Sequence, residues 1–358
     1  MSISNLLIVA GAGASRELSN DAQQKMPLMG DWANDLNKRL DKLGRLGASL
    51  QLPRDPTNRD AGPEFEAKLG RFLAWQRALP TVSLLPSLGT GFGHEQVPDA
   101  VHEWFQHANN NGRTIINTIH ESLSELFAAS RISQVSARDA DGQLLEECRL
   151  ASDSKLVFAT TNYDPAIELG LLELNRRPFW GEDGSIRGES ETRIHVQGMA
   201  TLPHHLTPVM HLHGMVGWYR KPDQQVYAIR AQSYNPQWGQ PALLLPDLVK
   251  SYEEDALIAA LWHEFDQALL DASHVLVIGH SLHDEHLVER LGSVGVQTRL
   301  AVGVYAGSSE GAADIAKNQA AEFNSILPRA TMIGMQFGRP VHIWDKAALE
   351  SWIGDDPV

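Results

Sequence analysis

Short apolar runs alternate with helical patterns along most of this chain. Residues 5–10 (NLLIVA) are apolar and enter a glycine turn, which is typical of a buried parallel strand. The runs at 155–160, 208–212, 274–278 and 299–305 have the same character and predict further core strands.

Helical periodicity lies between these runs. Asp164 and Pro165 open a predicted helix that extends to Leu174, with Asp164 as its N-cap. Strands that alternate with helices predict an α/β fold with a doubly wound, mostly parallel Rossmann-like sheet. Further helices are expected at 252–272, 284–291 and 312–323, and shorter strands at 193–196, 225–229 and 341–344.

Two segments interrupt this alternation. Residues 31–131 show helical spacing of apolar side chains and are expected to form a helical insertion with an internal loop at 79–98. Residues 175–207 have no clear period and are expected to be a loop-rich insertion. The Rossmann-like domain then comprises residues 1–30 and 150–358.

Composition and charge exclude several classes of protein. Of the 358 residues, 43% are hydrophobic and 21% charged, as in an ordinary globular protein. The formal net charge of −14 argues against a surface that binds nucleic-acid phosphates directly. The start does not resemble a signal peptide, and no stretch reaches the roughly 20 apolar residues of a membrane span. We therefore expect a cytoplasmic protein that contacts neither membranes nor nucleic acid directly.

A glycine-rich segment, GAGAS at 11–15, follows the first predicted strand directly. Glycines at this place let backbone amides approach a pyrophosphate that a Cβ would obstruct. The segment lacks the third glycine of the usual dinucleotide fingerprint, and an ordinary tight turn that serves packing explains it equally well. Its interpretation therefore depends on the other motifs.

The segment TTNYD at 160–164 ends the second core strand. It places amide, hydroxyl and carboxylate groups at the carboxyl end of a strand, where ligands of open α/β sheets bind. Taken alone, the motif is better explained by Asp164 as a helix cap.

The segment HLHG at 211–214 ends another apolar strand, and its two-residue period places His211 and His213 on one face. Three interpretations are open: a structural pair, half of a metal site, and a general base next to a sugar hydroxyl. Cys148 is the only cysteine, so a thiolate zinc cage is excluded. The metal interpretation lacks an evident third and fourth ligand, for which His204, His205, His283 and His286 are the candidates.

The segment GHSLHD at 279–284 follows the strand at 274–278 and opens a helix. Ser281 and Asp284 supply a hydroxyl and a carboxylate that suit a ribose. A nucleophile elbow requires glycine at the position of His283, so a serine hydrolase is disfavoured.

Taken in order, GAGAS, TTNYD, HLHG and GHSLHD resemble the motifs of the sirtuin family, in which a GAG-x-S loop, a T-x-N-x-D segment, an H-G and a G-x-S follow one another. The resemblance covers about half of the chain and leaves the helical insertion and 175–207 without a counterpart. LLLP at 243–246 and VIGHSLHDEHL at 277–287 look like the prokaryotic sirtuin-like branch of antiphage defence systems.

The resemblance implies a role for each matching residue. His213 is the expected base at the ribose hydroxyls, and Asn162 is the other expected catalytic residue, on the nicotinamide ribose side. Asp284 fits the G-x-S-x-x-D pattern of the defence branch. The expected NAD-binding residues are Gly11, Ala12, Gly13 and Ser15 at the diphosphate, Thr161 and Asp164 next to Asn162, Gly279 and Ser281 at the adenosine, and Asp284.

One departure from the family bears on the reaction. Deacylating sirtuins bind zinc through two cysteine pairs, which this chain with Cys148 alone does not supply. We therefore expect no structural zinc, water as the acceptor, and an NAD glycohydrolase that forms nicotinamide and ADP-ribose. Two alternatives stay open: a zinc-free NAD-dependent deacylase or ADP-ribosyltransferase, and a non-catalytic nucleotide-sensing module.

No sensor or ATPase motif is recognisable in the sequence. We therefore expect activation by self-assembly into a homo-oligomer or by another protein. By the family resemblance, the candidate partners are an ATPase of the HerA type and a short Argonaute with its guide.

Overall fold

The computed structural model describes most of the Rossmann-like part of the chain and portions of the helical segment. The described residues are 3–16, 29–44, 64, 67–76, 78, 99–127, 132–181, 191–229, 235–245, 252–253, 255–305, 312–336, 342–343 and 345–354. The loop predicted at 79–98 lies outside them.

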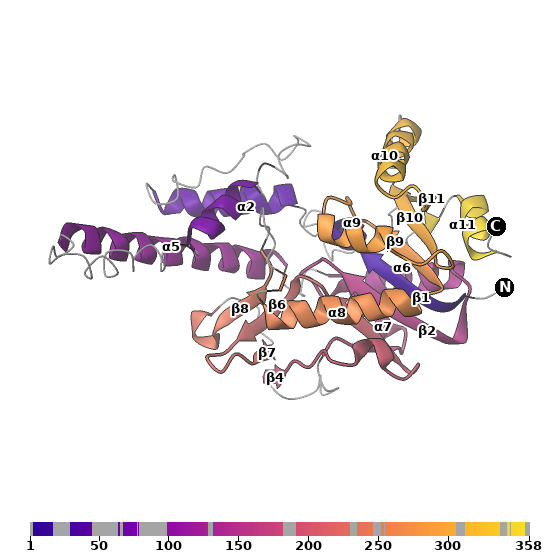
Figure 1. The fold of residues 1–358 in the computed structure, drawn as a ribbon, viewed down its shortest axis with the longest axis horizontal. Helices are drawn as coiled ribbons and strands as arrows, with labels where there is room; N and C mark the ends of the chain where they lie inside the picture. The colour runs from indigo at the N-terminus through magenta and orange to yellow at the C-terminus, as the bar shows by residue number, and fades with distance from the viewer. Residues whose placement is uncertain are drawn as a thin grey trace, which may run out of the picture.

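Within the described residues, eight strands form one sheet in the order β12-β11-β10-β9-β1-β2-β5-β3 (Figure 1). Neighbouring strands are parallel except β11 and β12 at one edge. This confirms the predicted doubly wound, mostly parallel sheet. The strands are β1 (Ile3–Ala10), β2 (Leu150–Thr160), β3 (Arg177–Phe179), β5 (Leu206–His211), β9 (His274–Ile278), β10 (Arg299–Tyr305), β11 (Thr331–Gln336) and β12 (His342–Ile343).

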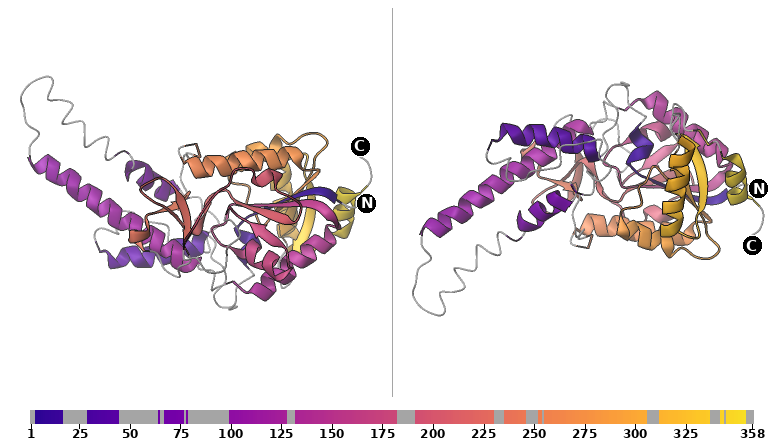
Figure 2. Two further views of the ribbon diagram at one scale, coloured as in Figure 1. Left: turned by 90° about the horizontal axis from the view of Figure 1, so that it is seen from below. Right: turned by 90° about the horizontal axis from the view of Figure 1, so that it is seen from above.

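Strand β1 lies at the centre of the sheet and pairs with β2 on one side and β9 on the other. Its residues 6–10 are at most 1% exposed, which explains why the run is apolar without alternation. Figure 2 shows α8 (Ala256–Asp271) on one face of the sheet and α6 (Gln134–Glu147) and α7 (Ala166–Glu173) on the other. The predicted strand 5–10 is therefore covered on both faces.

Several elements packed in or against the large sheet were not predicted. Helix α6 contains the polar stretch 136–142, where Ser133 caps the helix by accepting a hydrogen bond from the Ser136 amide at 3.2 Å. Half of its buried residues are Ala or Ser, such as Ala137 and Ala140, which weaken the apolar period of the helix. Strands β3 and β11 of the large sheet and the closing helix α11 (Lys346–Ile353) were not predicted either.

The start of α7 differs from the expectation. Its N-cap is Pro165, not Asp164, and the helix begins at Ala166. The Asp164 carboxylate still accepts a hydrogen bond from the Ala166 amide at 3.0 Å, so it stabilises the turn that enters the helix. The predicted capping carboxylate is present, one residue before the cap position.

A second sheet of four antiparallel strands, in the order β4-β7-β6-β8, lies beside the large one within the described residues. The strand expected at 193–196 is β4, which occupies 191–193 instead. The strand expected at 225–229 is confirmed as β7. The strands are β4 (Glu191–Arg193), β6 (Gly214–Arg220), β7 (Val226–Ile229) and β8 (Gln240–Leu243).

The helical segment contains α2 (Met29–Lys42) and the long α5 (Asp99–Leu126), which lie side by side and extend away from the large sheet (Figures 1 and 2). Trp32, Leu36 and Leu40 are almost completely buried, as their helical spacing predicts. Arg39 of α2 forms an ion pair with Glu125 of α5 at 2.6 Å. None of the described helices is both long and apolar enough to cross a membrane.

Candidate functional site

The four motifs follow strands β9, β1, β2 and β5, which are consecutive neighbours in the sheet. Because these strands are parallel, the loops after them project from the same edge. The chain passes from β1 to β2 and β5 on one side and later to β9 on the other side, so the strand order reverses at β1. Ligands of open α/β sheets bind in the crevice at such a reversal.

Asn162 joins the loop after β2 to the loop after β1. Its Nδ2 donates to the Gly11 carbonyl at 3.0 Å and to the Ser15 hydroxyl at 2.9 Å. The Ser15 hydroxyl in turn donates to Asp164 Oδ1 at 3.0 Å. All three polar side chains are buried. The structure thus brings the GAGAS and TTNYD motifs into one hydrogen-bonded unit.

The loops after β1 and β9 are in backbone contact. Gly13 donates its amide hydrogen to the Gly279 carbonyl at 2.9 Å. A Cβ on Gly11 would lie 2.6 Å from that carbonyl oxygen, and one on Gly279, where φ is +60°, would lie 2.2 Å from the Ala14 amide nitrogen. These glycines are therefore required for loop packing, which is the alternative that the sequence left open. Their contact with a diphosphate remains a prediction.

The loop after β9 also holds a residue in an unfavourable backbone conformation. Leu282 has φ of 57°, in the left-handed region, and its side chain is buried. The Leu282 amide donates to His280 Nδ1 at 2.9 Å, which contributes to holding this turn. Such conformations cost about 1–3 kcal/mol and are concentrated at functional sites.

The two histidines of HLHG have different surroundings. His211 is completely buried; its Nε2 contacts Glu168 of α7, and its Nδ1 lies 3.3 Å from the Asn162 carbonyl. Burial alone would lower the pKa of His211, but the adjacent Glu168 carboxylate raises it above the ordinary value. His211 is therefore placed to donate to the backbone of Asn162.

His213 belongs to a second network. Its Nε2 lies 3.0 Å from Asp284 Oδ2, and both side chains are buried. The Tyr252 hydroxyl donates to both oxygens of Asp284, at 2.9 and 3.0 Å. Asp284 is also the N-cap of α9 (Glu285–Gly292) and accepts from the Leu287 amide at 3.3 Å.

Backbone bonds connect these two networks. The Leu212 amide donates to the Thr160 carbonyl at 2.8 Å, and the Val216 amide donates to the Tyr163 carbonyl at 2.9 Å. The segments around Asn162 and His213 therefore lie on adjacent, mutually bonded loops.

The remaining predicted residues lie further out. Ala12 and Ser281 are exposed, and Gly13 and Thr161 are half-buried. The structure therefore separates the predicted set into a buried layer and an outer layer at the strand ends.

Sequence reasoning missed Tyr252 and Glu168. Tyr252 was expected to begin the helix at 252–272, whereas α8 starts at Ala256 and leaves Tyr252 in the preceding turn. Glu168 follows Asp164 by four residues. This spacing of two carboxylates near the start of a helix was the signal in the sequence that could have identified Glu168.

No group of three or more His, Cys, Asp or Glu side chains in the described part of the chain is arranged to hold a metal ion. Cys148 is buried, and burial raises the pKa of its thiol to about 12. The expectation of no zinc remains a prediction.

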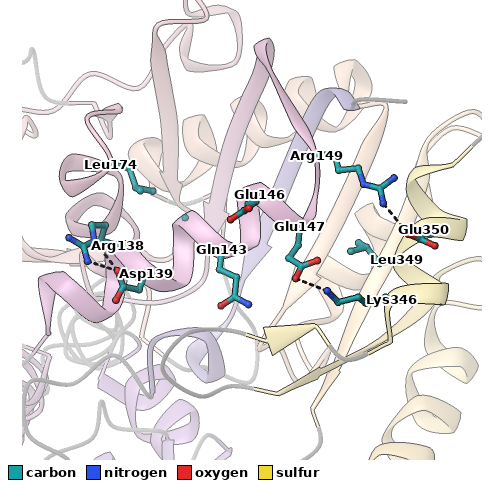
Figure 3. A pocket seen from close by; sticks show the side chains of 11 residues that line it. Arg138, Asp139, Gln143, Glu146, Glu147, Arg149, Leu174, Lys346, Leu349 and Glu350 are labelled. Carbon is teal, nitrogen blue, oxygen red and sulfur yellow. Dashed lines mark hydrogen bonds and ion pairs between the residues drawn. The ribbon is translucent and has the colours of Figure 1, made fainter.

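A hollow of about 700 Å³ lies between α6 and α11 (Figure 3). It borders Arg149, which precedes the core of β2, so it is at the opposite end of this strand from the motifs. Its walls carry both charges, with ion pairs Glu147–Lys346 at 3.4 Å and Arg149–Glu350 at 3.0 Å. This hollow is separate from the candidate site.

Comparison with known proteins relates part of the chain to a family. Residues 156–324 match the family model of the SIR2-like domain, which supports a relation to the sirtuin-like family and an NAD-related enzyme activity. A search among curated proteins found no match. The match runs from β2 into α10 (Ala312–Ile326) and contains three of the four motifs. GAGAS precedes it, yet is bonded to two of them.

Proposed function

We propose that this protein is an NAD glycohydrolase that cleaves NAD to nicotinamide and ADP-ribose. The observation that carries the proposal is the arrangement of four NAD-type motifs on consecutive parallel strands, with Asn162 and His213 on adjacent loops. The match of residues 156–324 to the SIR2-like domain supports NAD as the ligand.

The chemistry requires little beyond positioning. NAD already carries a good leaving group, so the protein must hold the nicotinamide–ribose bond and stabilise an oxocarbenium-like centre. In this proposal Asn162 acts on the nicotinamide ribose side, and His213 is the base at the ribose hydroxyls. A positioned base contributes about 10²–10⁴-fold to the rate. The rest of the proposed pocket consists of the expected NAD-binding residues Gly11, Ala12, Gly13, Ser15, Thr161, Asp164, Gly279, Ser281 and Asp284.

Water is the proposed acceptor because the chain lacks the paired cysteines of the deacylase zinc module. The resemblance to the defence branch further leads us to propose an effector role in antiphage defence, as a homo-oligomer or with an ATPase of the HerA type or a short Argonaute. A protein acceptor and a non-catalytic nucleotide sensor are the competing outcomes of the experiment below.

Chromatography of NAD incubated with the protein, alone and with its partner, tests the proposal. Nicotinamide and ADP-ribose should form in equal amounts. Asn162→Ala and His213→Ala should each nearly abolish cleavage, and the double variant should be scarcely worse if the two act as one unit. His211→Ala should lose less turnover than His213→Ala.

His283→Ala is the control, because His283 precedes Asp284 but has an exposed side chain. Near-normal turnover in His213→Ala would contradict the assignment of the base. Label from NAD on protein, or O-acetyl-ADP-ribose formed with an acetylated peptide, would point to the transferase or deacylase. Binding without turnover in the assembled complex would point to the sensor.

A further inference from the structure

The ring of His213 is held by a carboxylate. An ionised carboxylate only accepts hydrogen bonds, so the Nε2 that faces Asp284 at 3.0 Å carries the ring hydrogen in the neutral imidazole. Nδ1 is then the nitrogen that takes up a proton. A carboxylate in this position fixes both the tautomer and the orientation of a histidine.

The carboxylate itself is held from two other directions. The Leu287 amide at the start of α9 donates to Oδ1, and the Tyr252 hydroxyl donates to Oδ1 and Oδ2. The helix start favours a negative charge at Asp284. Of these two donors, the Leu287 amide belongs to the backbone and the Tyr252 hydroxyl to a side chain, so the hydroxyl is the one that a substitution removes selectively.

The Tyr252 ring has a well-defined place. It stacks on His286 of α9 with ring centres 4.0 Å apart and an angle of 9°, and it packs edge-on against Trp262 of α8 at 5.1 Å. Tyr252 as a whole is 7% exposed. The packing of two helices thus determines where the hydroxyl lies.

A second tyrosine offers a close comparison. The rings of Tyr163 and Tyr252 lie 6.4 and 6.3 Å from the ring of His213, and both residues are buried. The Tyr163 hydroxyl donates to the Leu244 carbonyl at 2.7 Å, not to the carboxylate that holds the histidine. The two residues therefore differ in what their hydroxyl groups bond.

We propose that Tyr252 is a positioning residue: through Asp284 it holds the tautomer and orientation of His213 that the reaction uses. This inference rests on the proposed function of His213 as the base. It also gives Asp284 a task within the protein, beside the cofactor contact expected from its motif.

Steady-state NAD cleavage by the full chain, in its activated form, compares Tyr252→Phe with Tyr163→Phe. Tyr252→Phe should lower kcat about tenfold, the effect expected of one hydrogen bond to a charged group, and leave KM within about twofold. Tyr163→Phe should keep kcat. Equal losses of kcat in both variants, or a loss confined to KM, would overturn the proposal.

Nitrogen-15 NMR of the histidine rings provides a readout that needs no turnover, with His213→Gln to identify the signal. Neutral His213 should be protonated at Nε2 alone in the native chain and in Tyr163→Phe, and should be a mixture of tautomers in Tyr252→Phe. A single tautomer in Tyr252→Phe overturns the positioning role. An activated native protein that leaves NAD intact contradicts the proposed glycohydrolase instead, so the two failures are distinguishable.

Discussion

The Asp164 side chain is almost completely buried between the loops that follow β1 and β2. Burial raises its pKa to about 6, although hydrogen bonds from the Ala166 amide and the Ser15 hydroxyl favour the charged form. The Glu168 charge raises the pKa further, and His211 lowers it. An unfolded chain releases this proton near pH 3.9. Between about pH 4 and 6 the native chain therefore keeps a proton that the unfolded chain has lost.

The sign of the resulting stability change follows from this difference. As the pH rises through the window, ionisation of Asp164 destabilises the native chain, by up to about 3 kcal/mol. Asp164→Asn has no such ionisation. Its melting temperature relative to the native chain should therefore increase between about pH 4 and pH 7.5.

The matched control is Asp345→Asn at the N-cap of α11, where the side chain is partly exposed and accepts from the Ala348 amide at 3.0 Å. The difference in melting temperature between Asp345→Asn and the native chain should change less over this pH range. A pH-independent melting difference for Asp164→Asn would show that ionisation of its carboxyl is not opposed by the fold.

At the scale of elements, the contact between the loops after β1 and β9 determines the shape of the site. These loops come from adjacent strands in the sheet but are separated by more than half of the chain. They approach so closely that an amide of one loop lies where a Cβ of the other would be. The turn at Gly279 also has a positive φ, which side chains rarely adopt.

Gly279→Ala should therefore separate the GAGAS loop from the loop after β9. The combination of backbone strain and overlap should destabilise the chain by about 2–4 kcal/mol. Thermal unfolding measures the loss of stability, and calorimetric titration with NAD should show weaker binding.

Gly292→Ala provides the comparison, because a Cβ on this last residue of α9 meets nothing within 4 Å. That variant should be neutral or slightly more stable. If Gly279→Ala melts like Gly292→Ala and binds NAD normally, the close loop contact does not determine the site.

At the scale of the whole molecule, the four motifs and the helical segment lie in different parts of the structure. The large sheet holds the four motifs at one edge, whereas α2 and α5 extend to the side (Figure 1). The chain carries a formal charge of −14. A negative net charge disfavours contact with nucleic-acid phosphates, so we expect recognition of a nucleic acid to require a partner.

We accordingly expect the purified chain to leave labelled single-stranded and double-stranded DNA unshifted in gel electrophoresis at about 0.15 M salt. Addition of a guide-loaded or ATPase partner should create binding that weakens as salt increases. Tight, salt-sensitive binding by the chain alone would mean that its basic residues are clustered in a way that the net charge conceals.

The sequence by itself determined the core of the sheet. Continuous apolar runs such as 5–10 and 274–278 have one stable place, between two layers of helices, so both were predicted close to their observed bounds. Because these apolar runs identify strands, the motifs that directly follow them could be placed at the carboxyl ends of those strands. Helix α6 was missed because small and polar residues on its buried face carry no strong periodic signal.

Only the tertiary structure decided which side chains act together. His211 and His213 look equivalent in the sequence, yet His211 faces Glu168 of α7 and His213 faces Asp284 at the start of α9. Tyr252 belongs to none of the four motifs, because the position of its hydroxyl is determined by the packing of its ring against α8 and α9. Hydrogen bonds between residues far apart in the chain depend on the order of the strands, which local patterns of apolar and polar residues do not encode.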